Sequence, residues 1–191
     1  MDKSNLHRGN IVDYIADIFL RRGAESYLGE SVTMSQHMLQ TALNAEQAGE
    51  SIATVVAGLL HDIGHYTGEF PEDYIEQGID NYHQTTGAAV LSKFFEDDVV
   101  EPVRWHVEAK RYLCAVDSGY FQKLSQASVD TLKLQGGPFN ESEVKAFKKN
   151  PYLDQIIRIR KYDDNGKNPD ILTPPIEHYL PKVQEVLDAY R

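Results

Sequence analysis

One short stretch in the first half of the chain constrains both its fold and its chemistry more than any other. An apolar helical run ends with Leu59-Leu60, and an adjacent histidine and aspartate, His61 and Asp62, follow it directly. A second histidine, His65, comes one helical turn after His61, so both rings would project from the same face. An imidazole nitrogen together with a carboxylate oxygen suits a divalent or trivalent metal ion. The stretch therefore predicts a metal site at the end of a buried helix.

The composition fits one soluble globular domain around this site. The chain has 191 residues, 41% of them hydrophobic, which is enough for a sizeable core. A net charge of -10 without a basic stripe argues against nucleic acid and anionic membranes as partners. The single cysteine, Cys114, the lack of an apolar stretch long enough to span a membrane and the lack of a signal-peptide core predict a cytoplasmic location. Nothing in the sequence indicates an oligomeric state.

Helical periodicity dominates the rest of the chain. Apolar residues at helical spacing predict an N-terminal helix over residues 10–22, a second helix over 31–48 that carries His37, and a third that Ser51 caps. Further helical runs begin near residues 87, 99, 128, 142 and 152, and a last helix covers residues 176–190. No strand pattern competes with these runs. We expect an all-α fold and a single metal-binding domain over residues 1–191, with the first and last helices flanking the metal core.

Residues 66–82 interrupt this periodicity with glycines, a proline, and interleaved aromatic and acidic side chains. A long loop of this kind beside a metal site is a candidate lid. Its aromatic faces could also attract a quaternary ammonium group. An equally good interpretation is that they pack the loop onto the domain. The aromatic residues of the loop are Tyr66, Phe70, Tyr74 and Tyr82.

Histidines and aspartates at helix ends and on helix faces carry the chemistry. Taken singly, a central histidine is more often a hydrogen-bonded structural residue than a ligand. The combination is more informative, because a histidine on one helix, a His-Asp pair on the next and a later aspartate at a helix end would meet at one metal ion. These residues are His37, His61, Asp62 and Asp163.

This order of ligands resembles the HD-domain superfamily, helical metal-dependent enzymes that are mostly phosphohydrolases. Two further histidines in the order of the chain, His83 and His106, would then supply a second metal ion. Asp62 could bridge both ions through its two carboxylate oxygens. The alternative for His83 and His106 is a structural or substrate-contacting role.

A longer set of motifs is similar to the HD-domain diiron phosphonate oxygenases, which are relatives of myo-inositol oxygenase. The similarity runs from about residue 27 to residue 167. Besides the six ligands, it includes Tyr27-Leu28-Gly29-Glu30, Gly64-His65, Ala109-Lys110-Arg111-Tyr112-Leu113, Leu124-Ser125, Ser128, Gln135-Gly136-Gly137-Pro138 and Tyr162-Asp163. Those enzymes use a mixed-valent Fe(II)/Fe(III) pair and dioxygen to cleave the carbon-phosphorus bond of 1-hydroxy-2-aminoethylphosphonate or its N-trimethyl analogue. Their products are phosphate and glycine or glycine betaine.

The resemblance implies two iron ions, dioxygen and a small hydroxyphosphonate substrate for this chain. One iron would be held by His37, His61, Asp62 and Asp163, and the other by Asp62, His83 and His106. Tyr27 matches a tyrosine that occupies the open position of one iron in the resting enzyme, and Glu30 matches a glutamate that meets the cationic nitrogen of the substrate. Taken alone, a tyrosine and a glutamate at this spacing are commonplace.

A phosphonate needs a cationic pocket in a protein this acidic. Lys110, one helical turn after His106, a protonated or donating His65, and the hydroxyl of Ser128 could bind its oxygens. Imidazole and carboxylate ligands suit iron, manganese and zinc alike, so the choice of iron rests on the resemblance.

Two choices stay open at this point. A primary amine substrate would be held by a hydrogen bond to Glu30, whereas a trimethylammonium group prefers aromatic faces, and the aromatic loop favours the latter. Among functions, the main alternative is an HD-superfamily phosphohydrolase acting on a small phosphate ester, which would work without oxygen. A non-catalytic ligand-binding HD domain is a third hypothesis.

Overall fold

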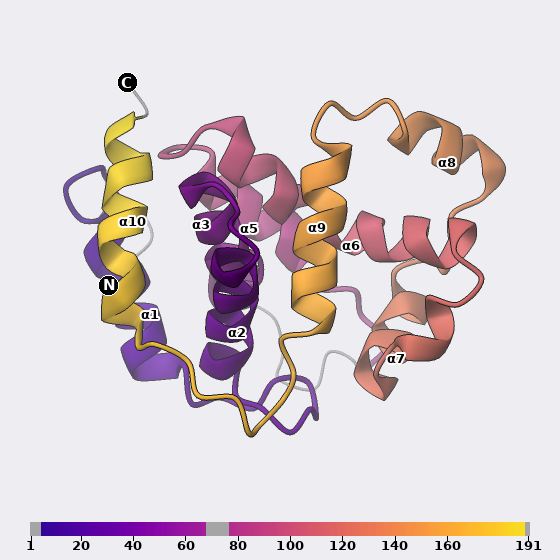
Figure 1. The fold of residues 1–191 in the computed structure, drawn as a ribbon, viewed down its shortest axis with the longest axis horizontal. Helices are drawn as coiled ribbons and strands as arrows, with labels where there is room; N and C mark the ends of the chain where they lie inside the picture. The colour runs from indigo at the N-terminus through magenta and orange to yellow at the C-terminus, as the bar shows by residue number, and fades with distance from the viewer. Residues whose placement is uncertain (1–4, 68–76, 190–191) are drawn as a thin grey trace.

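The computed structural model describes residues 5–67 and 77–189, and in these ranges the chain is all-α, as predicted (Figure 1). The helices are α1 (Ile11–Arg22), α2 (Met34–Gln47), α3 (Ile52–Leu60), α4 (Gly64–Thr67), α5 (His83–Leu91), α6 (Asp97–Val116), η2 (Phe121–Lys123), α7 (Gln126–Leu134), α8 (Glu141–Phe147), α9 (Leu153–Asp164) and α10 (Ile176–Ala189). The only β-type pairing in these ranges is an isolated bridge between Ser26 and Thr33. None of the helices in these ranges combines the length and the apolar character needed to cross a membrane.

Helix α3 lies at the centre of the molecule. It packs against α2, α6, α9 and α10, and its side chains are buried on nearly every side, which explains its apolar sequence. Helix α9 contacts α2 and α6 as well, so α2, α3, α6 and α9 pack together. Helices α1 and α10 lie side by side at one end of the molecule, while α7 and α8 lie at the other end (Figure 1).

Side-chain caps set the start of the helices that carry the predicted ligands. Thr33 and Gln36 form a capping box, in which the Thr33 hydroxyl accepts from Gln36 N and the Gln36 side chain accepts from Thr33 N. This box begins α2 at Met34 rather than at the predicted residue 31. Ser51 caps α3, as expected from the sequence.

The predicted boundaries are wrong around the loop between α3 and α5. Helix α4 continues to Thr67, where a loop was expected, and α5 begins at His83 rather than near residue 87. Tyr82, just before α5, has a left-handed backbone with φ of 47°. His83 therefore lies in the first turn of a helix.

Two glycines allow α4 and α5 to touch. A Cβ atom on Gly64 would lie only 1.8 Å from the His83 carbonyl oxygen, and one on Gly87 would lie 3.1 Å from Gly64 N. This approach stacks the rings of His65 and His83, whose centroids are 4.1 Å apart. The crossing of the two short helices thus places both histidines at the end of α3.

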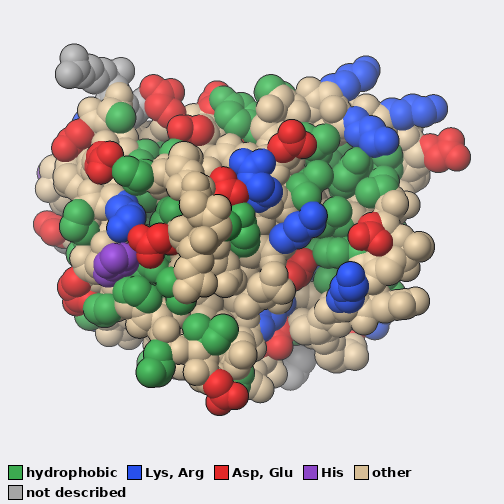
Figure 2. Space-filling view, in the orientation of Figure 1, with side chains coloured by type: hydrophobic (Ala, Val, Ile, Leu, Met, Phe, Trp, Pro, Cys, Tyr) green, Lys and Arg blue, Asp and Glu red, His purple; other side chains and the backbone are tan. Residues whose placement is uncertain are grey.

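Acidic and basic side chains are interspersed over the face shown in Figure 2. On this face the described residues form no continuous basic surface, in keeping with the net charge of -10. The cationic side chains at the site are buried or partly buried and are described below.

Candidate metal centre

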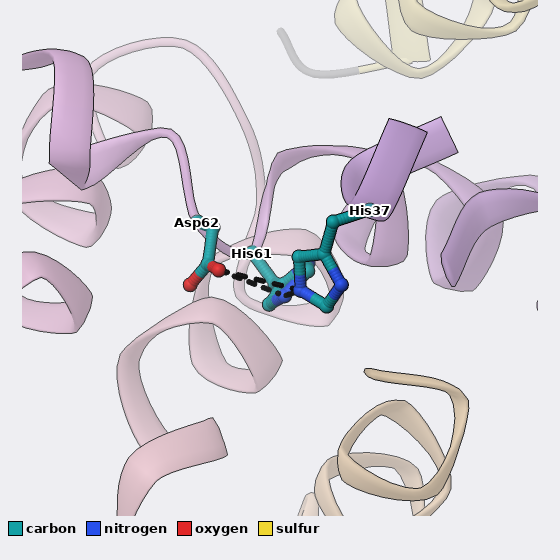
Figure 3. A group of neighbouring side chains, drawn as sticks. All are labelled: His37, His61 and Asp62. Carbon is teal, nitrogen blue, oxygen red and sulfur yellow. Dashed lines mark hydrogen bonds and ion pairs between the residues drawn. The ribbon is translucent and has the colours of Figure 1, made fainter. Parts of the chain in front are cut away.

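A first cluster of ligand atoms lies between α2 and the end of α3 (Figure 3). His37 Nε2 is 3.0 Å from His61 Nε2, and each of these nitrogens is 3.4 Å from Asp62 Oδ2. His37 comes from α2, whereas His61 ends α3 and Asp62 follows in the next turn. All three side chains are buried. Three possible ligand atoms therefore point at one position in the interior.

A second cluster lies on the other side of Asp62. His83, at the start of α5, and His106, in the middle of α6, have their Nε2 atoms 3.1 Å apart. Each Nε2 is 3.3 Å from Asp62 Oδ1. Asp62 thus faces one histidine pair with each of its two oxygens.

The other ring nitrogen, Nδ1, of each of these four histidines contacts an oxygen that can only accept a hydrogen bond. Nδ1 must therefore carry the proton, and in a neutral ring Nε2 then presents a lone pair. This is the tautomer that a metal ligand needs. The pairs are His37 with Gly166 O (3.0 Å), His61 with Gly58 O (2.8 Å), His106 with Val103 O (2.8 Å) and His83 with Asn81 Oδ1 (2.8 Å).

Each cluster consequently needs a positive charge at its centre, because two neutral rings would otherwise direct lone pairs at one another. A proton can meet this need in the first cluster: burial lowers the pKa of His61, but the charges of Asp62 and Asp163 outweigh it and raise that pKa to about 9. In the second cluster, burial lowers the pKa of His106 to about 4. A metal ion would meet the need in both clusters.

Two features of the possible ligand atoms fit bound metal ions: the distances between them, and two carboxylate oxygens that accept no hydrogen bond. Ligand atoms about 2.1 Å from one ion, at angles of roughly 90 to 110°, are about 3.0 to 3.4 Å apart, and this is the spacing in both clusters. Asp62 Oδ2 and Asp163 Oδ1 are buried and accept no hydrogen bond within the described residues. Buried carboxylate oxygens without a hydrogen bond call for another partner, such as an ion.

Asp163, near the C-terminal end of α9, completes the first cluster. Its Oδ1 atom is 3.4 Å from His37 Nε2, and its Oδ2 atom pairs with Arg160 Nη1 at 2.8 Å. Although burial opposes it, the Arg160 charge holds the pKa of this carboxyl below its ordinary value. The structure thus brings all six residues with predicted ligand roles to one place, arranged as two groups that share Asp62.

A cavity of about 30 Å³ opens on the two groups. The residues to which the sequence assigned substrate or catalytic roles all line it: Tyr27, Glu30, Asp62, His65, Lys110 and Ser128. Tyr27 stacks on His37 with ring centroids 3.9 Å apart. Burial, and then the charges of Asp62 and Asp163, raise the pKa of Tyr27 well above its ordinary value, so it stays a phenol.

His65 also lines the cavity, stacked on His83. Burial places the pKa of His65 well below its ordinary value. The ring is therefore neutral near pH 7. A neutral ring can still donate a hydrogen bond through the one N–H that it carries.

Lys110 is buried on α6 and reaches across the cavity to α7. Its Nζ atom donates to Thr131 Oγ1 at 2.8 Å and to Ser128 O at 3.4 Å. Burial lowers the pKa of Lys110 to about 7, with the nearby Arg160 charge acting in the same direction. Near neutral pH this lysine can therefore exist in either form, and an anion bound beside it would favour the charged one.

Two further cations at the cavity, Lys167 and Arg160, were not predicted. Lys167 Nζ donates to Ser128 Oγ at 2.8 Å and lies 3.5 Å from Glu30 Oε1, which also accepts a 2.5 Å hydrogen bond from Ser125 Oγ. Arg160 precedes Asp163 by three residues and Lys167 follows it by four. This spacing around a proposed ligand was the one signal in the sequence that could have found them.

The two aromatic side chains of the loop that lie within the described residues do not line the cavity. Tyr66 is buried beside Arg22, whose backbone oxygen accepts from its hydroxyl, and Tyr82 is 59% exposed. Neither of these two rings lines the cavity. Phe70 and Tyr74 lie outside the described residues, as does most of the predicted lid.

Known proteins are similar to this chain over most of its length. Residues 34–136 match the HD domain family. The chain is 51% identical over 189 residues to a 1-hydroxy-2-(trimethylamino)ethylphosphonate dioxygenase (glycine-betaine-forming) of Leisingera caerulea, covering 99% of this chain and 96% of that protein. It is 38% identical over 165 residues to a hydroxymethylphosphonate dioxygenase of Gimesia maris, covering 86% and 82%. An uncharacterised protein of Acanthamoeba polyphaga mimivirus is 33% identical over 171 residues, covering 88% and 78%.

Proposed function

The chain belongs to the HD domain family, and from this premise we propose that it is an oxygenase that cleaves the carbon-phosphorus bond of 1-hydroxy-2-(trimethylammonio)ethylphosphonate. Identity of 51% along nearly the whole chain to a dioxygenase named for this substrate supports the proposal. One dioxygen molecule is used for each substrate molecule. The carbon-phosphorus bond breaks, C1 becomes the carboxylate carbon of glycine betaine, and phosphorus leaves as phosphate.

The proposed cofactor is a pair of iron ions in the mixed-valent Fe(II)/Fe(III) state. When bound, this pair supplies the redox chemistry that activates dioxygen. The first iron is assigned to His37, His61, Asp62 and Asp163, and the second to Asp62, His83 and His106. One observation carries the proposal. Asp62 lies between two pairs of histidines, and the Nε2 lone pairs of each histidine pair point at the same position beside it.

The cavity suits a substrate with both a negative and a positive end. Lys110 and Lys167, together with the Ser128 hydroxyl, bind the phosphonate oxygens, and charge-assisted hydrogen bonds of this kind are strong. Glu30 faces the cationic nitrogen. In the structure, Glu30 pairs with Lys167. When the substrate binds, its cationic nitrogen replaces Lys167 as the partner of Glu30, and its phosphonate replaces Glu30 as the partner of Lys167.

Substrate binding also requires side chains to move. Tyr27 and Glu30 both line the cavity, so their side chains occupy space that a bound substrate would need. Tyr27 and Glu30 lie on a turn with two left-handed residues, Leu28 (φ 50°) and Gly29 (φ 78°), outside any helix. We assign the displacement to these two side chains, because neither is anchored on a packed helix.

The test is the ratio of oxygen consumed to phosphate formed. Protein loaded with iron under anaerobic conditions is given the trimethylammonium substrate and then a known amount of dioxygen. We expect one phosphate and one glycine betaine for each dioxygen consumed. Failure to release phosphate with either this substrate or its primary amine analogue would show that the proposed function is wrong.

The same experiment separates the main alternative. A metal-dependent phosphohydrolase uses water, so it would release phosphate from a phosphate ester at the same rate with and without oxygen and would accept manganese or zinc. Parallel reactions with the trimethylammonium, primary amine and hydroxymethyl phosphonates rank the substrates. We expect the trimethylammonium compound to have the highest kcat/KM.

A further inference from the structure

Asn81, a buried residue just before α5, connects two histidines of the site through one side-chain amide. Its Oδ1 atom contacts His83 Nδ1 at 2.8 Å and His83 N at 3.3 Å. Its Nδ2 atom contacts His65 Nδ1 at 3.1 Å. Asn81 is 2% exposed and lines the cavity, so water does not compete freely for these contacts.

The backbone of His83 fixes which way the amide faces. A backbone N–H can only donate, so the Asn81 atom that it contacts must be the oxygen. The same oxygen then accepts from His83 Nδ1, which must carry its proton. The amide nitrogen on the other side donates to His65 Nδ1, which must present a lone pair. The single proton of neutral His65 is therefore on Nε2.

The partner of His83 differs from those of the other three histidines in the two clusters. His37, His61 and His106 each donate Nδ1–H to a backbone carbonyl, whereas His83 donates to a side chain. A carbonyl or a carboxylate would serve His83 equally well, since carboxylates commonly orient metal-bound histidines. Neither could donate to a second ring. The amide accepts from one histidine and donates to the other.

We propose that Asn81 is a positioning residue that gives two stacked histidines opposite tautomers: His83 with a bare Nε2 for the metal, and His65 with an Nε2–H for the substrate. The second half of this assignment rests on the proposed function and on the role that the sequence predicts for His65, a hydrogen bond donated to a phosphonate oxygen. Without Asn81, the His65 ring could place its proton on Nδ1 and turn a lone pair toward the anion. His65 would then repel the substrate that it should bind.

The tautomers can be read directly by NMR on the full chain. Histidine labelled with 15N is incorporated, the protein is loaded with zinc, which is diamagnetic, and two-bond proton–nitrogen correlations show which ring nitrogen carries the proton. In the unmodified protein we expect Nε2–H for His65 and Nδ1–H for His83. A proton on Nδ1 of His65 would overturn the proposal.

Two substitutions separate the two roles of the amide. Asn81→Asp keeps an acceptor for His83 but removes the donor, so His65 should change to the Nδ1–H tautomer while zinc content stays the same. Asn81→Ala removes both, and zinc affinity at the His83 group should fall about 10- to 100-fold. If Asn81→Ala does not fold, Asn81→Asp alone decides, and an unchanged His65 tautomer in it would overturn the proposal.

Asn10→Asp is a matched control. The Asn10 amide likewise accepts from a backbone N–H, that of His7, and donates to the oxygen of Asn5, far from the cavity. We expect it to leave both tautomers and the zinc content unchanged. In iron-loaded protein, Asn81→Asp should raise the KM for the phosphonate roughly 10- to 100-fold, the usual effect of a lost hydrogen bond to a charged group. If NMR shows the expected tautomers but the protein turns over no phosphonate, the proposed function is wrong. The role of Asn81 toward His83 would still stand.

Discussion

At the scale of single residues, the ionisation of Lys110 gives the activity a distinct pH dependence. Its pKa is about 7, because burial disfavours the charged form. Below that pH the ammonium group is present to bind an anionic phosphonate, and above it the group loses its charge. We therefore expect kcat/KM, which reports ionisations of the free enzyme, to fall as the pH rises above about 7.

Two substitutions identify Lys110 as the source of this fall. The arginine of Lys110→Arg remains charged at every accessible pH, so the fall in kcat/KM near pH 7 should disappear in this variant. In Lys110→Met, kcat/KM should be low at every pH and should also show no fall near pH 7. Ionisation of the substrate affects all three proteins alike. A profile of Lys110→Met that still falls near pH 7, as in the unmodified protein, would contradict the assignment.

Lys167 provides a second test at this scale. Its ammonium group donates to Ser128 Oγ and lies beside Glu30 at the cavity. Lys167→Met should weaken substrate binding about 10- to 100-fold, the range for hydrogen bonds to charged groups. Anaerobic calorimetry measures this binding without turnover. Lys161→Met, at an exposed position on α9, is the control and should bind normally.

At the scale of helices, the contact between α4 and α5 is the tightest constraint on the second group of ligands. In Gly64→Ala the new Cβ atom would lie 1.8 Å from the His83 carbonyl oxygen, and backbone atoms cannot rotate away from it. Overpacking of this kind costs about 1 to 3 kcal/mol or more of unfolding free energy. We expect such a loss in urea unfolding, together with reduced metal content, because α5 carries His83.

Gly58→Ala is the matched control for Gly64→Ala. Its Cβ atom would lie 3.4 Å from Thr41 O and 3.5 Å from Ile159 Cδ1, which are ordinary contacts. Alanine also limits the freedom of the unfolded chain, so this variant should be as stable as the unmodified protein or slightly more stable. Equal stability of the two alanine variants would contradict the role given to the helix crossing.

The sequence predicted those parts of the fold that depend on local pattern. Apolar spacing located the long helices, and the six candidate ligands could be chosen because they lie on or beside those helices. Helix α4 was missed because four residues are too short to show a helical period. Lys167 and Asn81 were missed because they lie in loops, and only the packing of α9 and of α5 against the core brings them to the cavity.

At the scale of the whole molecule, the candidate metal centre joins residues that lie far apart in the sequence. Its six candidate ligands come from α2, the end of α3, α5, α6 and α9. Ions that bind only the folded chain add about 2.7 kcal/mol of stability per site when present at about 100 times their dissociation constant. Removal of metal with a chelator should therefore lower the Tm by several degrees, and added metal should restore it. An unchanged Tm after complete removal would show that the centre contributes nothing to folding.

The central claim is that Asp62 is the shared edge of two metal sites, with one oxygen facing His37 and His61 and the other facing His83 and His106. The most direct measurement is the iron content per chain of the unmodified protein and of two variants after anaerobic loading. We predict two irons for the unmodified protein, one for His83→Ala, and none for Asp62→Ala. Retention of two irons by Asp62→Ala would contradict the claim.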